Sequence, residues 1–520
     1  MLPFKEENVV RKDWRKVDLK IALCYPNVYR AGMSGLTVQL LYALLNSRED
    51  VVCERFFLPT KNEPLLSVES NQPLNKFDVV AFTFQYEEDY VNALRMLIDS
   101  KIEVWVEKRR AKPILVAGGP CIFENPTPLR QFIDLFVVGE IEPLLDEFVD
   151  GLKESVKEKT VENFQEKDGY LTPTSNLTRK VYIKDLDEAP HPIAQVIPNV
   201  DSNSSYLPVF GRTFTVEVMR GCPGRCRFCL ISHVNKPMRK RSVKKLEEII
   251  GEGLKYTKVS KVTLIGAGVA YYPKLEDICE YITGLGLKIS VSSLAANLVT
   301  EKLVECLVKG GQRTITLAPE TGSDEFRRKV VGKPLTNEQI LDASKVALKK
   351  GIRNIKLYFV IGFPGEKEED IESIVELSRK IAELGFGPKS VRLSINPLIP
   401  KPHTPFQFCK IMSIDYLKKA YMKVKNKLRD KRIEVEGFNP KHAYIQTALS
   451  MGNQKLGEII FKVAKYGGNL GSWRRVLKKE KISLESLLQP PRLDEEPVWS
   501  IVDVGVDDKL LAEEYLRILR

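Results

Sequence analysis

Residues 213–229 read TFTVEVMRGCPGRCRFC, an apolar run that passes directly into a loop with two glycines and three cysteines. The β-branched and aromatic run predicts a buried strand, and the glycines and proline predict a turn after it. The loop places Cys222, Cys226 and Cys229 in C-x3-C-x2-C spacing. Three thiolates this close together are able to ligate three irons of a 4Fe-4S cluster and leave the fourth iron without a protein ligand. We favour this cluster over zinc, because His233 is the only neighbouring residue that offers a fourth zinc ligand.

Apolar strands and amphipathic helices alternate on both sides of this stretch. Six strands are expected in the second half of the alternating region, at residues 213–219, 261–265, 288–293, 313–318, 354–360 and 390–395. One of the helices between them opens with a capping box, Thr336 to Gln339. Six βα units are two fewer than a closed eight-stranded barrel needs. We therefore predict an open, partial (βα)6 barrel over residues 211–405, with its site at the C-terminal ends of the strands.

The N-terminal region has the same alternation with a different pattern of loops. Strands at residues 20–24, 51–57, 78–82, 113–119 and 135–140 predict an α/β domain with a doubly wound parallel sheet over residues 1–165. Such sheets bind ligands where their strands end, which is at Tyr25-Pro26-Asn27, Gln85-Tyr86-Glu87, Gly118-Gly119-Pro120 and Gly139-Glu140. Residues 166–210 are rich in Pro, Asn, Ser and Thr and predict a linker lying over neighbouring surfaces. Residues 406–520 predict a mainly helical accessory region.

Composition limits the class of protein. The chain has 520 residues, 43% of them apolar, and 80 Lys and Arg against 68 Asp and Glu. It lacks a signal-peptide core and the roughly 18 consecutive apolar residues of a transmembrane segment, so we expect a cytoplasmic protein. In a reducing compartment, clustered cysteines indicate metal binding or catalysis. The basic run from Tyr416 to Arg432 is more typical of a solvated helix face than of an RNA site. An RNA-binding module is the non-enzyme alternative.

The cysteine loop and the strand ends after it resemble those of the radical SAM superfamily, over about Thr213 to Phe406. This resemblance implies that the three cysteines hold the cluster, that an external electron donor reduces it, and that S-adenosyl-L-methionine (SAM) is cleaved to a 5′-deoxyadenosyl radical. The glycine-rich segment of this chain lacks the acidic residue often found there in the family. The implied SAM contacts are Phe228, Gly266-Ala267-Gly268, Ser292 and Ser293, Glu320, Arg327 or Arg328, and Ile361 in the turn VIGFPGE, residues 360–366.

The N-terminal domain resembles the cobalamin-binding domain of the cobalamin-dependent radical SAM enzymes, through the AGGP turn and the segment VGEIEPLLDEF. No histidine precedes His191, so the resemblance implies cobalamin bound without a protein imidazole. The implied cobalamin contacts are Gln85, Tyr86 or Glu87 near the lower face, with Gly118, Gly119, Pro120, Gly139 and Glu140. A Rossmann-like domain that binds nothing is the alternative. Phrases such as TLAPETGS and VWSIVDVGV extend the similarity to an uncharacterised radical SAM group.

We therefore expect a cobalamin-dependent radical SAM enzyme, a C-methyltransferase acting on an unactivated carbon of a protein side chain, a lipid or a small metabolite. Radical ring formation or rearrangement without methyl transfer is one alternative. A tRNA methylthiotransferase is another, with Cys24, Cys53 and Cys121 as ligands of a second cluster. The middle ligand of such a set should end the strand where Phe82 and Phe84 stand. We expect these three cysteines to be buried core residues instead.

Overall fold

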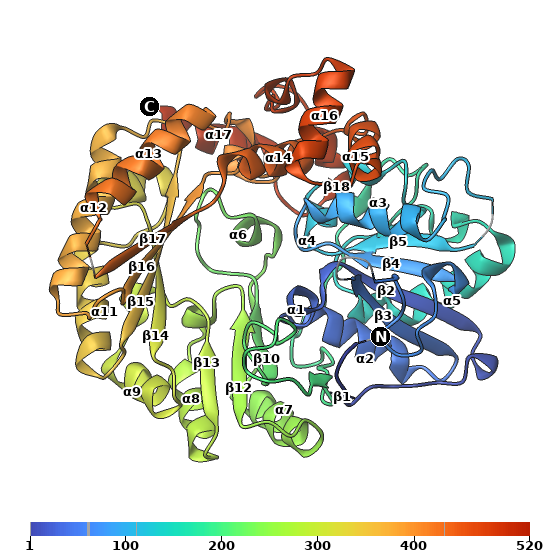
Figure 1. Cartoon of the computed structure of the whole chain (residues 1–520), viewed down its shortest axis with the longest axis horizontal. Helices are drawn as coiled ribbons and strands as arrows, with labels where there is room; N and C mark the ends of the chain where they lie inside the picture. The colour runs from blue at the N-terminus through green and yellow to red at the C-terminus, as the bar shows by residue number, and fades with distance from the viewer. Residues whose placement is uncertain (1, 60–62, 111, 431) are drawn as a thin grey trace.

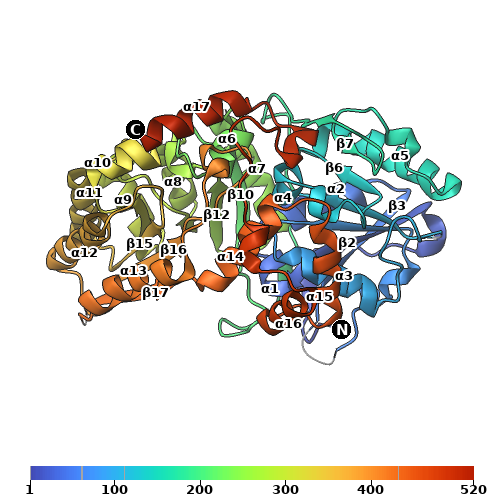
Figure 2. The same ribbon diagram turned by 90° about the horizontal axis from the view of Figure 1, so that it is seen from above.

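The computed structural model describes residues 2–59, 63–110, 112–430 and 432–520. Two α/β bodies lie side by side, and helices from the C-terminal region cross between them (Figures 1 and 2). The blue and cyan body in Figure 1 is the N-terminal domain, and the green to orange body is the partial barrel.

The N-terminal domain is built on a six-stranded sheet in the order β3-β2-β4-β5-β6-β7. Its strands are β2 (Leu19–Val28), β3 (Val51–Leu58), β4 (Val79–Thr83), β5 (Ile114–Gly118), β6 (Leu135–Val137) and β7 (Tyr170–Leu171). The first five are parallel and β7 is antiparallel to β6. Because the strand order reverses between β2 and β4, the loops there open a crevice at the carboxyl edge of the sheet, as doubly wound sheets do.

Both faces of this sheet are covered, which explains the continuous apolar strands. The helices are α1 (Tyr29–Gly32), α2 (Thr37–Ser47), α3 (Asp89–Asp99), α4 (Pro120–Glu124) and α5 (Leu145–Glu158). Side chains such as Ala22 and Val80 pack with α3, and their neighbours Leu23 and Val79 pack with α2 and α5. This alternation follows from the two-residue period of a strand. β2 is longer than expected, because it continues past a register shift after Tyr25.

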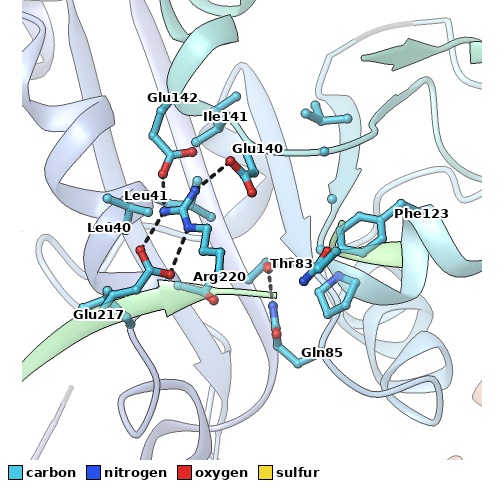
Figure 3. Close-up of a pocket in the computed structure, with 18 of the residues that line it drawn as sticks. Leu40, Leu41, Thr83, Gln85, Phe123, Glu140, Ile141, Glu142, Glu217 and Arg220 are labelled. Atoms are coloured by element: carbon cyan, nitrogen blue, oxygen red, sulfur yellow. Dashed lines mark hydrogen bonds and ion pairs between the residues drawn. The ribbon is translucent and has the colours of Figure 1, made fainter. Parts of the chain in front are cut away.

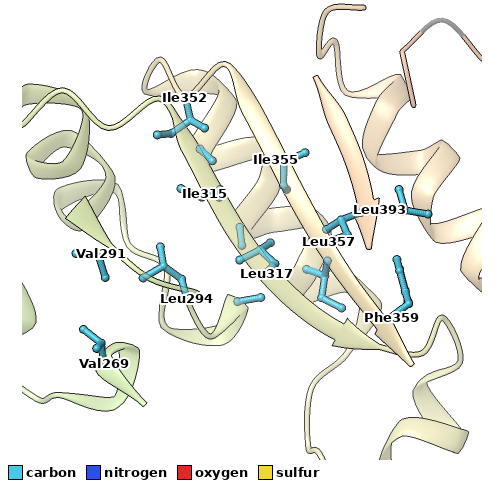
Figure 4. Packing of buried hydrophobic residues seen from close by; sticks show 14 of the residues in the cluster. Val269, Val291, Leu294, Ile315, Leu317, Ile352, Ile355, Leu357, Phe359 and Leu393 are labelled. Atoms are coloured by element: carbon cyan, nitrogen blue, oxygen red, sulfur yellow. The ribbon is translucent and has the colours of Figure 1, made fainter. Parts of the chain in front are cut away.

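The second body is a curved parallel sheet. Its parallel strands are β10 (Phe214–Arg220), β12 (Lys261–Gly266), β13 (Lys288–Val291), β14 (Thr314–Glu320), β15 (Asn354–Ile361), β16 (Val391–Pro397) and β17 (Ile433–Gly437). β13 and β14 are joined by a single bridge between Leu294 and Leu317, and β11 (Arg239–Lys240) pairs antiparallel with β10. The apolar layer between the sheet and its covering helices continues across this junction, from Val291 and Leu294 to Leu317 and Leu357 (Figure 4).

Helices cover the outside of the barrel. They are α7 (Val243–Tyr256), α8 (Leu275–Gly284), α9 (Glu301–Lys309), α11 (Asn337–Lys349), α12 (Glu368–Glu383) and α13 (Ile414–Lys427). The predicted capping box is confirmed, since the Thr336 hydroxyl accepts a hydrogen bond from Gln339 N (3.2 Å) and Gln339 Oε1 accepts one from Thr336 N (3.0 Å).

β17 lies in the region that the sequence predicted to be mainly helical, and it extends the barrel beyond residue 405. Its sequence, IEVEG, contains two apolar residues and lies on the edge of the sheet. A strand this short and half-exposed leaves little periodicity to detect.

The expected linker, residues 166–210, contributes β7 to the N-terminal sheet and forms further short strands. Its short strands β8 (Thr178–Arg179) and β9 (Ile197–Pro198) pair with β18 (Val502–Asp503) and β1 (Glu6–Glu7). The C-terminal helices are α14 (Pro440–Met451), α15 (Leu456–Lys465), α16 (Leu470–Glu480) and α17 (Asp508–Leu519). α15 packs against the N-terminal domain, with side chains such as Ile459 and Val463 in the core that α3 covers. Among the described residues, no helix has both the length and the apolar character needed to cross a membrane.

Candidate functional site

The cysteine loop follows β10 at the C-terminal edge of the barrel, and its three thiols are half-buried. Two glycines lie beside the sulfurs of Cys222 and Cys226. A Cβ added to Gly224 would lie 3.3 Å from Cys222 Sγ and 4.0 Å from Cys226 Sγ, and one added to Gly268 would lie 3.1 Å from Cys222 Sγ. The chain therefore leaves room around the sulfurs where side chains would intrude.

The loop is held from behind by the segment after β14. Arg227 N donates to Val331 O at 2.9 Å, and the Arg227 guanidinium donates to Lys329 O at 2.6 Å. Burial raises the pKa of the Cys226 thiol to about 12, and the nearby Lys333 ammonium opposes this rise. The free Cys226 thiol is therefore protonated at neutral pH, and iron binding has to displace its proton. A soft three-thiolate donor set on a cradle of glycines fits a 4Fe-4S cluster.

A cavity of about 550 Å³ opens beside the cysteine loop. Cysteine-loop residues Pro223, Gly224 and Arg225 form one side, and Tyr271 and residues 294–297 form another. The segment after β14 closes it with Arg328 and with residues 332–335, which include Lys333. The Lys333 ammonium is itself held by Glu320, 2.9 Å away. This cavity lies at the strand ends where the barrel was expected to bind its ligand.

The structure brings some of the predicted SAM residues to this region. Phe228 packs edge-on against Phe363, with ring centroids 6.1 Å apart. Glu320 is buried with a left-handed φ of 65° and pairs with Lys333. Gly268 contacts the cysteine loop as described above, while Gly266 and Ala267 line a different cavity, between the two bodies.

Other predicted SAM residues lie elsewhere. Ile361 is a barrel-core residue whose carbonyl accepts a hydrogen bond from Leu398 N at 2.8 Å. Ser292 is half-buried and Ser293 is exposed, and the cavity is lined instead by the residues directly after them.

Arg327 requires a correction. Its side chain is fully buried and donates to Pro319 O (2.8 Å), Leu335 O (2.8 Å) and Asn337 Oδ1 (2.7 Å). These bonds hold the turn after β14 and engage all three nitrogens of the guanidinium. Of the two arginines considered, it is Arg328 that lines the cavity. Sequence spacing alone does not separate two adjacent arginines, because a local π-helical turn decides which one points inward.

The cavity between the two bodies has a volume of about 450 Å³ (Figure 3). From the N-terminal domain it is lined by Gln85, Gly118, Gly119, Pro120, Gly139 and Glu140, all of them predicted from the strand-end loops. One wall is apolar and consists of Leu36, Leu40, Leu41, Leu45 and Phe148. The barrel contributes residues 219–221 and Gly266-Ala267, so the cavity reaches the base of the cysteine loop.

Tyr86 and Glu87 do not line this cavity, contrary to the sequence-based expectation. The Tyr86 hydroxyl donates to Glu88 at 2.7 Å. The Glu87 carboxylate is buried, pairs with Lys401 and accepts from Gln446 Nε2 at 2.8 Å. The Glu87 side chain therefore faces α14, which carries Gln446. Gln85 alone of the three lines the cavity, where it donates to the Thr83 hydroxyl at 3.2 Å.

Sequence reasoning missed other residues around the two cavities. Lys180, Glu142, Glu217 and Arg220 line the cavity between the bodies, and Tyr271 and Lys333 line the other. Arg220 pairs with Glu217 of its own strand and with Glu142, which lies 78 residues earlier in the chain. Only the position of Arg220, directly before the cysteine loop, carries a local signal.

The three N-terminal cysteines are core residues, as expected. Cys24 and Cys53 have no exposed surface and Cys121 is 3% exposed. Cys24 and Cys121 belong to the core that α3 covers, whereas Cys53 packs on the opposite face of the sheet. A sheet separates them, so the three thiols do not form a common ligand set.

Two family models match the chain. The model for radical SAM proteins, N-terminal, matches residues 37–183, and the model for the radical SAM superfamily matches residues 216–378. The uncharacterized protein MJ0966 of Methanocaldococcus jannaschii is 33% identical over 484 residues, which are 93% of this chain and 98% of that protein.

More distant relatives are named for an activity. The uncharacterized methyltransferase PH0819 of Pyrococcus horikoshii is 29% identical, over 51% of this chain and 58% of its own. A tRNA-2-methylthio-N(6)-dimethylallyladenosine synthase of Clostridium botulinum is 22% identical, over 61% of this chain and 74% of its own.

Among solved structures, the radical SAM methyltransferase TsrM from Kitasatospora setae, with tryptophan and a SAM analog bound, has a TM-score of 0.55 at 11% identity, covering 89% of this chain and 98% of TsrM. At this identity, the likeness concerns the fold. The full-length match to MJ0966 and the two domain matches together show that the chain belongs to the radical SAM superfamily, as an enzyme whose barrel follows a radical SAM N-terminal domain.

Proposed function

We propose that this radical SAM enzyme is a cobalamin-dependent C-methyltransferase. The observation that carries the proposal is the cavity between the two bodies, which runs from the strand ends of the doubly wound domain to the base of the cysteine loop. TsrM, in a structure with cobalamin and a 4Fe-4S cluster bound, shares the fold at a TM-score of 0.52, 14% identity and about three quarters of each chain. When bound, SAM at the cluster would supply a carbon radical and cobalamin would supply a methyl group to the substrate.

The lining of the cavity suits the two chemically different parts of cobalamin. Leu40, Leu41 and Phe148 form an apolar slot beside the sheet, which fits an aromatic base removed from water. The rim is polar, with Gln85 and Lys180 able to donate hydrogen bonds to amide oxygens of a corrin ring. The two parts of the lining therefore match a ligand with an apolar tail and a polar fringe.

No imidazole is available at this cavity. The four histidines, His191, His233, His403 and His442, all lie in the described part of the chain, and none lines the cavity. His191 and His403 are buried among other residues, and burial lowers the pKa of each, to about 3 and about 4. The described chain therefore offers no histidine to a cobalamin held in this cavity.

The role of the protein in the reaction is to position the partners and exclude water. The glycines around the thiols leave space for the cluster, and the apolar slot holds its ligand out of solvent. A primary carbon radical attacks the nearest C–H bond, so the product is decided by which atom the protein holds close. The tRNA methylthiotransferase alternative needs a second cluster, and the burial and separation of Cys24, Cys53 and Cys121 give it no support.

The proposal is tested with SAM carrying a deuterated methyl group. Anaerobically reconstituted protein is incubated with reductant, labelled SAM and an extract of cells that lack the gene. We expect the label in a new carbon–methyl bond, only when the protein carries cobalamin and only together with 5′-deoxyadenosine. Labelled carbon–methyl product formed equally without cobalamin, or a labelled methylthio group, would contradict the proposal.

A further inference from the structure

One arginine joins the two bodies at the cavity between them. Arg220 is the last residue of β10, and its guanidinium is surrounded by three carboxylates (Figure 3). It lies 2.9 Å from Glu140 and 2.5 Å from Glu142, both from the N-terminal domain, and 2.9 Å from Glu217 of its own strand. Charge-assisted bonds of this length are strong and directional.

The carboxylates on the N-terminal side are themselves fixed. Glu140 receives two bonds from Arg239, at 2.8 and 2.7 Å, and one from Ile183 N at 3.0 Å. Although burial raises it, the guanidinium groups of Arg239 and Arg220 hold the pKa of Glu140 below its usual value. The Glu142 side chain is only 3% exposed. Arg220 is therefore bonded to rigid, desolvated partners across the boundary, where an ion pair is least screened.

Arg220 is also tightly connected to the metal-binding loop. Only Gly221, with φ of 79°, separates it from Cys222. A Cβ added to Gly221 would lie 2.2 Å from Asn235 O, so the backbone passes close to the end of α6 (Leu230–Val234) at this point. A displacement of Arg220 would consequently be passed on to Cys222.

We propose that Arg220 is a positioning residue that holds the cysteine loop in a fixed place relative to the cavity between the two bodies. The identity of the ligand in that cavity rests on the function proposed above, but the mechanical link does not. Glu140 and Glu142 are the partners through which the N-terminal domain sets the position of the loop. If Arg220 has this role, a substitution of Glu140 or Glu142 in the N-terminal domain alters the environment of the cluster.

The experiment uses the full chain with its cluster reconstituted and without cobalamin. Arg220→Lys keeps the charge and removes the planar fork, and Glu142→Gln removes a partner that belongs to the other domain. The matched control is Arg212→Lys, which alters another ion pair to an N-terminal residue, Glu7, at 2.7 Å and in more exposed surroundings. The measurements are iron content, the EPR spectrum of the reduced cluster with SAM, and the dissociation constant of SAM.

We expect Arg220→Lys and Glu142→Gln to keep their iron, to change the EPR line shape in the same way and to weaken SAM binding at least three-fold. Arg212→Lys should match the parent. If folded Glu142→Gln has the parent spectrum and affinity, the proposal is wrong, and Arg220 acts only within its own strand. If Glu142→Gln does not fold, Glu140→Gln is measured by the same criteria. Should the parent fail to bind cobalamin while these effects persist, the proposed function fails and the positioning role stands.

Discussion

At the scale of single residues, sequence spacing predicted three cysteines on one loop, and the structure places that loop at the end of β10 with its thiols half-buried. Phe228 belongs to this loop, whereas Gly268 and Glu320 come close to it from other strands, because the carboxyl ends of parallel strands share one edge. What spacing did not decide is which way a side chain points. The Arg327 guanidinium donates hydrogen bonds to two carbonyl oxygens and one amide oxygen and so points away from the cavity. The Glu87 carboxylate pairs with Lys401, which lies 314 residues away in the chain.

The first prediction concerns Cys226. Cys226→Ala removes one of three thiolates, so the reconstituted protein should lose most of its iron and all cleavage of SAM to 5′-deoxyadenosine. Cys279→Ala is the control, because Cys279 is buried in the barrel core and should cost only packing energy. Iron analysis and product chromatography check both variants. Normal SAM cleavage by Cys226→Ala would show that the loop does not hold the catalytic cluster.

A second prediction concerns the N-terminal cysteines. Since Cys53 is on the opposite face of the sheet from Cys24 and Cys121, replacing all three by Ala should leave iron per chain unchanged. Lost packing should lower the free energy of unfolding by roughly 1–3 kcal/mol in total. A folded triple variant with half the iron of the parent would reveal a second cluster and favour the methylthiotransferase alternative.

A third prediction concerns Glu124, which is buried with Glu87 around the Lys401 ammonium. Burial raises the pKa of Glu124 to about 8, although Lys401 opposes this rise. A carboxyl with a raised folded-state pKa binds its proton more tightly when folded. Its contribution to stability is therefore complete below the unfolded pKa and is lost as pH rises to about 8.

Glu124→Gln removes this loss while keeping a hydrogen-bonding side chain. Between about pH 5 and pH 8, the parent should lose stability relative to the variant by up to about 1.4 kcal/mol per pH unit. Urea unfolding across this range measures the difference, with the exposed Glu158→Gln as control. If the free energy of unfolding depends on pH in the same way for the parent and Glu124→Gln, the pKa of Glu124 is not raised on folding.

At the scale of elements, the strands and helices with long, regular patterns were predictable. All six expected barrel strands and the five N-terminal strands are present, because buried parallel strands read as continuous apolar runs. β17 was not predictable, since its IEVEG sequence has too few apolar residues to show a period. The apolar wall of the cavity was not predictable either. In the sequence, Leu40 and Leu41 look like ordinary core residues of α2, but in the structure they line a cavity.

The fourth prediction uses that wall. Leu41→Trp fills part of the slot beside α2 and should weaken cobalamin binding at least ten-fold, because the added ring occupies space needed by the ligand. Iron content and SAM cleavage should stay within two-fold of the parent, since the cluster lies on the other body. Ser47→Trp, at the exposed end of the same helix, is the control. Cobalamin retention by gel filtration gives the readout, and equal retention by Leu41→Trp and Ser47→Trp would contradict the placement.

At the scale of the whole molecule, the function depends on how the two bodies meet. The linker strands β8 and β9 and helices α14 and α15 fasten the bodies to each other, and Arg220 completes the contact at the cavity. Sequence reasoning predicted the two folds and both sets of strand ends separately. It did not predict that Gly266, Ala267 and Gln85 line one cavity, because this depends on the docking of the bodies and no local pattern encodes it.

We propose that one chain carries a cluster on its barrel and cobalamin at the boundary with its N-terminal domain. The most direct test is to load the anaerobic protein with cobalamin, reduce the cobalt to Co(II) and record its EPR spectrum. We expect about one cobalt and about four irons per chain, with three-cysteine ligation of the cluster. We also expect a Co(II) signal without nitrogen superhyperfine splitting, because no histidine lines the cavity. Absence of bound cobalt, or clear nitrogen splitting from a protein ligand, would contradict the proposal.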